Sequence, residues 1–167
     1  AGDHVALGQK LNAMHEESRA ATAEIARLRG ELRLMRMRVY SWAGRCDPEI
    51  NRLVFDIWSE SRKVLTLAET NRLVWAESRC DPFATDGKCF GLMQLDPRYV
   101  LPGVALDQAR EQLIDPEFNV KKGMAHLDEL ALQFKGDKVK ILTAWNWGRT
   151  RMVKGVTTGT FAGKVLQ

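Results

Sequence analysis

The sequence predicts a mainly α protein in which a long N-terminal helix precedes a compact helical domain. Three observations support this prediction. Apolar residues recur at steps of three and four along most of the 167 residues, Asp-Pro pairs open helical stretches, and strand-like alternation is almost absent. The 45% apolar and 28% charged residues are typical of a globular protein with a real core.

Residues 1–44 carry a heptad repeat of apolar side chains. The seam consists of Leu7, Leu11, Met14, Ser18, Ala21, Ile25, Leu28, Leu32, Met35 and Val39. With Leu11 and Ile25 at a positions, a parallel dimer would bring Glu24 to the partner's Arg29 and Glu31 to its Arg36. We therefore expect one helix over residues 4–42 and a homo-oligomer formed through it. The alternative is a single helix whose stripe packs on its own domain.

Residues 45–167 are expected to form the second domain, beginning after the Gly44 region. The predicted helices cover residues 48–62, 65–78, 116–134 and 138–147, with a small β-hairpin near residues 84–95. No apolar run reaches membrane-spanning length and no export signal is visible, so we expect no transmembrane segment.

Charge, cysteine and histidine patterns exclude several classes of function. The net charge of +4 is small, and the arginines of the first helix lack interleaved aromatic residues, so we expect no nucleic-acid partner. The three cysteines lack metal-binding spacing, and His4, His15 and His126 are scattered, so no metal or organic cofactor is expected. Cys80 and Cys89 flank one loop, where they are either free thiols or a disulfide.

Glu77 lies near the end of a predicted helix, on the same face as Leu73 and Val74. Apolar neighbours disfavour the ionised carboxylate and raise its pKa, as a general acid requires. The alternative is an ordinary solvent-facing Glu. A glycosidase needs such an acid together with apolar walls and amides that bind sugar hydroxyls, and the stretch from Glu77 to Gln94 contains all three.

Four sequence blocks resemble the lytic transglycosylase branch of the lysozyme-like superfamily, whose members cleave the MurNAc-GlcNAc β-1,4 bond of peptidoglycan. The blocks are Glu77-Ser78 with Pro82 and Gly91 to Gln94; Pro116, Asn119-Val120, Gly123 and Leu127; Ala144 to Gly148; and Thr158, Phe161, Ala162 and Val165. The resemblance covers the chain from about residue 50 onwards and implies a lysozyme-like fold, a peptidoglycan substrate and no cofactor.

The resemblance also implies site residues. Glu77 would be the catalytic acid, and Gln94, Met93 and Asn146 would line the saccharide groove. Loop capping for Gln94 and core packing for Met93 are the alternatives, and Asn119 is expected to support a helix start.

This chain departs from the family pattern at Trp145, Thr150 and Phe161 and in the length of the loop between Pro82 and Gly91. Trp145 replaces the family's Tyr, which removes a hydroxyl but leaves a ring that could stack on a sugar. Thr85 and Asp86 compete for the position of the family's Ser.

A second resemblance, over Phe90 to Tyr99, is to goose-type lysozymes, in which acidic residues help to hold a water molecule. Asp96 falls on one such position and Asp86 lies within one residue of the other. Hydrolysis by a muramidase is therefore the alternative to transglycosylation, which needs no second carboxylate. A non-catalytic glycan-binding or coiled-coil assembly module is a further alternative. A peptidoglycan substrate implies an extracytoplasmic location (periplasm or cell wall) or a phage virion.

Overall fold

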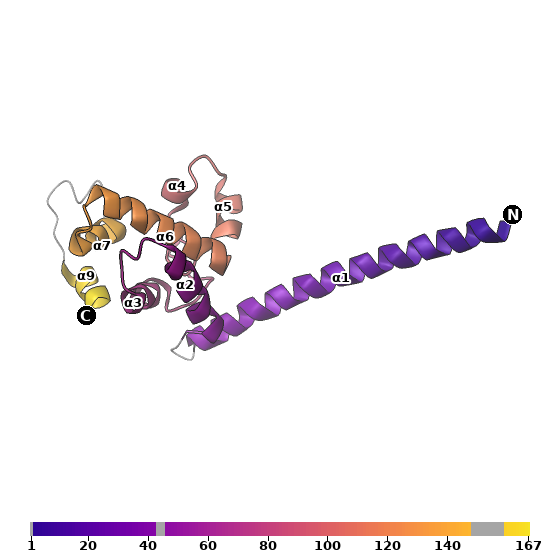
Figure 1. Cartoon of the computed structure of the whole chain (residues 1–167), viewed down its shortest axis with the longest axis horizontal. Coiled ribbons are helices and arrows are strands. Elements are labelled where there is room, and N and C mark those ends of the chain that lie inside the picture. The colour runs from indigo at the N-terminus through magenta and orange to yellow at the C-terminus, as the bar shows by residue number, and fades with distance from the viewer. Residues whose placement is uncertain (1, 43–45, 148–158) are drawn as a thin grey trace. The chain divides into compact units, whose positions relative to one another are not determined.

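The computed structural model describes residues 2–42, 46–147 and 159–167 (Figure 1). The chain forms two compact units, Ala1–Arg36 and Met37–Gln167. The predicted domain boundary at residues 44 and 45 lies outside the described residues, as do Gly148 and Thr158 of the sequence blocks. The predicted mainly α fold is confirmed.

Helix α1 runs from Gly2 to Trp42 and spans the boundary between the units. Its residues up to Arg36 belong to the first unit, and those from Met37 onwards belong to the second. Its 41 residues correspond to a length of about 60 Å at 1.5 Å per residue. Arg27 pairs within the helix with Glu24, at 2.7 Å between Nη2 and Oε1, and with Glu31. No helix among the described residues is both long enough and apolar enough to cross a membrane.

Among its described residues, the second unit contains the four predicted helices and three further ones. Its helices are α2 (Pro48–Glu60), α3 (Leu67–Ser78), α4 (Pro97–Val100), α5 (Leu106–Leu113), α6 (Pro116–Gln133), α7 (Lys138–Trp147) and α9 (Gly159–Leu166). Local sequence fixes several starts: Asp47, Asp96 and Asp115 each cap a helix that opens with Pro. Thr66 and Glu69 form a reciprocal capping box at the start of α3.

Helix α6 crosses the middle of this unit and packs against α2, α5 and α7, while α3 packs against α2 and α9 (Figure 1). The core is apolar, and its largest fully buried side chains include Ile50, Leu65, Leu73, Leu92, Met93, Leu113, Leu127, Leu130, Ile141 and Leu142. This packing fixes both α3, which carries Glu77, and α7, which carries Trp145.

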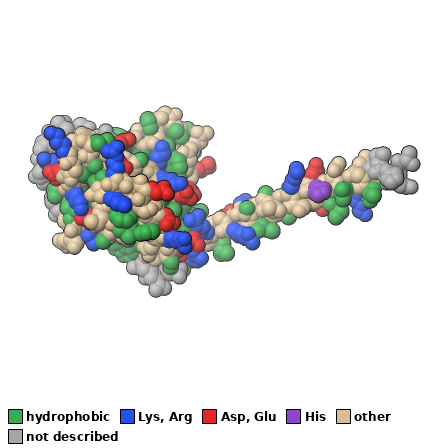
Figure 2. All heavy atoms as spheres, viewed as in Figure 1, with side chains coloured by type: hydrophobic (Ala, Val, Ile, Leu, Met, Phe, Trp, Pro, Cys, Tyr) green, Lys and Arg blue, Asp and Glu red, His purple; other side chains and the backbone are tan. Residues whose placement is uncertain are grey.

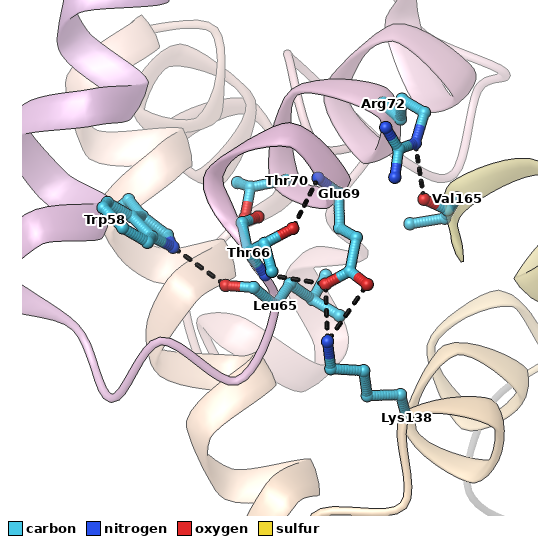
Figure 3. A network of polar contacts seen from close by, with 8 residues as sticks. All are labelled: Trp58, Leu65, Thr66, Glu69, Thr70, Arg72, Lys138 and Val165. Atoms are coloured by element: carbon cyan, nitrogen blue, oxygen red, sulfur yellow. Dashed lines mark hydrogen bonds and ion pairs between the residues drawn. The ribbon is translucent and has the colours of Figure 1, made fainter. Parts of the chain in front are cut away.

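A polar network holds α3 to its neighbours (Figure 3). The Glu69 carboxylate accepts hydrogen bonds from the backbone N–H of Thr66 and from Lys138 Nζ, both at 2.7 Å. Arg72 Nε donates to the carbonyl of Val165 at 2.7 Å. Since Lys138 begins α7 and Val165 lies on α9, these contacts fix the orientation of α3 against both helices.

The loop between α3 and α4 contains no strand, and the predicted hairpin is reduced to two isolated bridges. Phe90 is bridged to both Thr85 and Leu95. Gly91 and Gln94 have positive φ angles of 79° and 46°, which turn the chain back before a ladder can extend.

The structure pairs Cys46 with Cys80 in a disulfide, with 5.2 Å between their Cα atoms, and leaves Cys89 as a free thiol. Both alternatives predicted for Cys80, a free thiol and a disulfide with Cys89, are therefore wrong. Because α2 and α3 pack as consecutive helices, the residue before α2 meets the residues after α3, although 34 positions separate them. Sequence proximity favoured Cys89, whereas helix packing selects Cys46.

Candidate active site

Glu77 occupies the last turn of α3 and is partly buried. Leu73 and Val74, one turn earlier, are at most 1% exposed. Ser78 donates to the carbonyl of Val74 at 3.1 Å and accepts from the backbone N–H of Cys80 at 3.1 Å, which fixes the end of the helix. The carboxyl group of Glu77 is thus held by a rigid helix against apolar packing, as its sequence position predicts.

The pKa of Glu77 is raised from its ordinary 4.5 to about 7. Burial is the main cause, because a carboxylate removed from water loses hydration. A hydrogen bond from Trp145 acts in the opposite direction, and the negative charge of Asp86 adds to the increase. A large fraction of Glu77 is therefore protonated near neutral pH, which suits a group that must donate a proton.

Trp145 is the direct partner of Glu77. Its indole Nε1–H donates to Glu77 Oε1 at 2.8 Å, from α7 to α3. The replacement of the family's Tyr therefore removes a hydroxyl but supplies another donor. Indole N–H can only donate, so Oε1 acts as the acceptor, and Oε2, which does not face the indole, is the better position for the acidic proton.

His126 on α6 packs against Trp145, with 5.5 Å between the ring centroids and 43° between the ring planes. His126 is partly buried, and its contact with Trp145 depends on helix packing that the chain order does not reveal. This contact restricts the indole ring that binds the acid.

Gln94 caps its own loop. Its Nε2 donates to the carbonyls of Ala84 and Gly91, at 2.8 and 2.9 Å. Of the two predicted roles, the structure supports loop capping. The side chain of Met93 is 0% exposed and lies against Gly123, where an added Cβ would be 2.3 Å from its sulfur. Of the two roles predicted for Met93, the structure therefore supports core packing, which keeps the side chain away from the surface.

Asn119, fully buried on α6, holds the same loop in place. It accepts a hydrogen bond from the backbone N–H of Met93 at 2.8 Å. It donates to the carbonyls of Phe90 and Leu113, at 2.9 and 2.8 Å. Asn119, from the second sequence block, thus holds the Gly91 to Gln94 turn of the first block in place. It contacts this turn in addition to the start of its own helix.

The remaining predicted site residues lie in different settings. Thr85 accepts from the backbone N–H of Gly87, and both Thr85 and Asn146 are exposed. Asp86 accepts from the backbone N–H groups of Cys89 and Lys88, which hold the pKa of its carboxyl below the ordinary value.

Asp96 caps α4 and pairs with Arg98, whose hydrogen bonds are the main cause that lowers the Asp96 pKa. Of the two aspartates, Asp86 is the one whose charge raises the Glu77 pKa. Asp96 instead stabilises the start of α4.

Cys89 is a neighbour that the sequence did not identify as a site residue. Burial raises the pKa of its thiol to about 11, with further contributions from the charges of Asp86, Asp96 and Glu77. The thiol therefore stays protonated near neutral pH. The described residues contain no cluster of three or more metal-ligating side chains.

A helical domain that holds a partly buried glutamic acid of raised pKa against an indole hydrogen-bond donor defines a candidate acid-catalysed glycosidase of the lysozyme-like type. Comparison with protein families agrees: residues 58–163 match the transglycosylase SLT domain, and the chain belongs to this family. Searches of curated proteins and of solved structures gave no match. Family membership supports cleavage of glycan strands of the lytic transglycosylase kind, with peptidoglycan as the substrate.

Proposed function

We propose that this chain is a peptidoglycan lytic transglycosylase that uses Glu77 as its single catalytic acid and base. It would cleave the MurNAc-GlcNAc β-1,4 bond and leave a 1,6-anhydroMurNAc end. The observation that carries the proposal is the setting of Glu77: its pKa lies near 7, and Trp145 donates to Oε1.

The reaction follows from the two states of Glu77. The proton on Oε2 passes to the glycosidic oxygen, and the bond from that oxygen to C1 of MurNAc breaks. The resulting carboxylate then takes the proton of the MurNAc C6 hydroxyl, whose oxygen bonds to C1 and closes the anhydro ring. Because the nucleophile belongs to the substrate, proximity replaces activation of water. Trp145 stabilises the carboxylate between the two transfers through its charge-assisted hydrogen bond.

Hydrolysis is the second candidate, and one observation favours keeping it. Asp86 is close enough to Glu77 for its charge to raise the Glu77 pKa. A second carboxylate near the acid is what an inverting glycosidase uses to activate water. Asp96 fits this role less well, because it caps α4 and pairs with Arg98 at 2.5 Å.

Mass spectrometry of digested purified murein separates the two reactions, since anhydro products are lighter by one water than reducing-end products. We expect anhydro products from the wild type and from Asp86→Asn. Asp107→Asn, an exposed aspartate on α5, is the matched control. Reducing-end products that disappear in Asp86→Asn but persist in Asp107→Asn would instead establish a muramidase.

Glu77→Gln tests the catalytic acid itself. Clearing of murein should fall by at least about a thousandfold, since both proton transfers are lost, while the helix content stays unchanged. Glu117→Gln, an exposed residue paired with Lys121, serves as control. A wild-type chain that binds murein but never clears it would leave the glycan-binding module as the answer.

The proposal also locates the protein. Peptidoglycan lies outside the cytoplasmic membrane, so the chain would act in the periplasm or cell wall, or from a phage virion. A Cys46–Cys80 disulfide fits such an oxidising environment.

A further inference from the structure

Helix α1 exposes large apolar side chains along its length that its own unit does not cover, and Figure 2 shows hydrophobic side chains at several places along the helix. We call these residues the apolar stripe: Leu7, Leu11, Met14, Ile25, Leu28, Leu32 and Met35. Each is 50–69% exposed. Large apolar side chains at such regular spacing along a long helix are typical of an interaction surface.

The spacing of the apolar stripe defines the geometry of its partner. Its members follow steps of four and three, completed by Ser18 and Ala21, so they repeat every 3.5 residues. This period keeps the stripe on one side when two helices supercoil with a left-handed twist. A partner helix of the same repeat therefore fits over the full length of the stripe.

Charges beside the stripe favour a second copy of this chain as that partner. Glu24 and Glu31 occupy g positions, and Arg29 and Arg36 occupy e positions. In a parallel pair each g position faces the partner's following e position, which brings Glu to Arg on both sides. In an antiparallel pair g faces g and e faces e, which brings like charges together.

Contacts within one helix do not prevent these pairs. Glu24 and Glu31 both contact Arg27, but the three side chains are 51–54% exposed. Exposed pairs of this kind contribute little and exchange readily. We propose that α1 is one strand of a parallel, two-stranded coiled coil formed by two copies of this chain. The proposal does not depend on the catalytic activity of the second unit.

Sedimentation equilibrium of the full chain over a range of concentrations tests the proposal. We expect the mass to approach twice the 18.9 kDa of one chain. Leu28→Glu places a charge in the stripe and should yield a monomer, whereas Ala26→Glu, which adds the same charge off the stripe, should still dimerise. Both variants should retain the activity of the wild type. A monomeric wild type, or equal behaviour of the two variants, would overturn the proposal.

Replacing Ala21, a small residue in the heptad seam, gives a second test, because the larger side chain should increase the affinity of one chain for the other. Ala21→Leu fills a d position that leaves a weak layer in the middle of the seam. It should tighten dimerisation by at least about tenfold, because two more large side chains become buried. An unchanged or weaker dimer would show that residue 21 does not lie in the interface.

Orientation and partner identity need their own experiments. Leu7→Cys should form a covalent dimer under mild oxidation, because equivalent d positions meet only in a parallel pair. The wild type, which carries the free Cys89, is the control. Glu24→Lys/Glu31→Lys and Arg29→Glu/Arg36→Glu should each be monomeric alone and dimerise when mixed. Absence of the covalent dimer would contradict the parallel arrangement, and a mixture that stays monomeric would contradict charge pairing.

Discussion

Replacing Trp145 by Phe should move the pH dependence of activity to higher pH. The substitution removes the N–H that donates to Glu77 Oε1 at 2.8 Å and keeps an aromatic ring in place. A hydrogen bond to a charged group contributes about 1.5–3 kcal/mol and one to a neutral group about 0.5–1.5 kcal/mol. The difference, about 1–2 kcal/mol, corresponds to roughly one pKa unit.

The direction follows from the same bond, which favours the ionised form of Glu77. Without it the pKa of Glu77 should rise from about 7 to roughly 8. Since the free enzyme must carry a protonated acid, kcat/KM for murein clearing should fall near pH 7 in the wild type and roughly one unit higher in Trp145→Phe. The plateau at lower pH should drop by about tenfold, because the carboxylate formed during the reaction loses its donor.

Trp58→Phe is the matched control, because its indole donates to the carbonyl of Leu65, at 2.8 Å, and not to Glu77. The pH profile of this variant should coincide with that of the wild type, even where stability falls. A Trp145→Phe profile that stays in place or moves to lower pH would refute the reasoning from the hydrogen bond.

Three further predictions concern stability, measured by urea unfolding. Gly91→Ala should lower the free energy of unfolding by at least about 3 kcal/mol, because its Cβ would lie 2.2 Å from a backbone oxygen; Gly87→Ala, with positive φ but nothing within 4 Å, should cost about 1 kcal/mol. Lys138→Met should cost about 1–2 kcal/mol, since it leaves the nearly buried Glu69 without its 2.7 Å partner. The free energy of unfolding of Glu77→Gln should equal that of the wild type at pH 4 and exceed it by up to about 3 kcal/mol at pH 8. Between pH 4.5 and 7 Glu77 ionises in the unfolded chain but stays protonated in the folded one, so the wild type loses stability as pH rises.

The sequence was sufficient to predict the main helices of the second unit, because their signals are local. Asp47 and Asp115 precede Pro and cap α2 and α6, and apolar spacing identifies the face that each helix buries. The short helices α4 and α5 were missed, since four and eight residues contain too few turns for a clear period. Glu77 was predicted as the catalytic acid from the resemblance of the four sequence blocks, because the apolar residues one turn earlier suit an ordinary helix-end Glu equally well.

The partners of Glu77 could not be predicted, because they depend on contacts distant in the chain. Trp145 reaches Glu77 across 68 positions, and His126 reaches Trp145 only after α6 and α7 pack together. The same limit applies to Cys46 and Cys80. For Met93 the sequence left groove lining and core packing open, because a motif records which residues recur and not which way their side chains point.

The loop that follows Glu77 has a consequence for comparing enzymes of this kind. Gly91 admits no side chain, Gln94 binds its own backbone, and Asn119 holds the turn from α6. These three motif residues therefore stabilise the loop, so finding them in another chain indicates that the same loop can form there. Whether such a chain still cuts glycan must be judged from the acid and from whatever donor touches it.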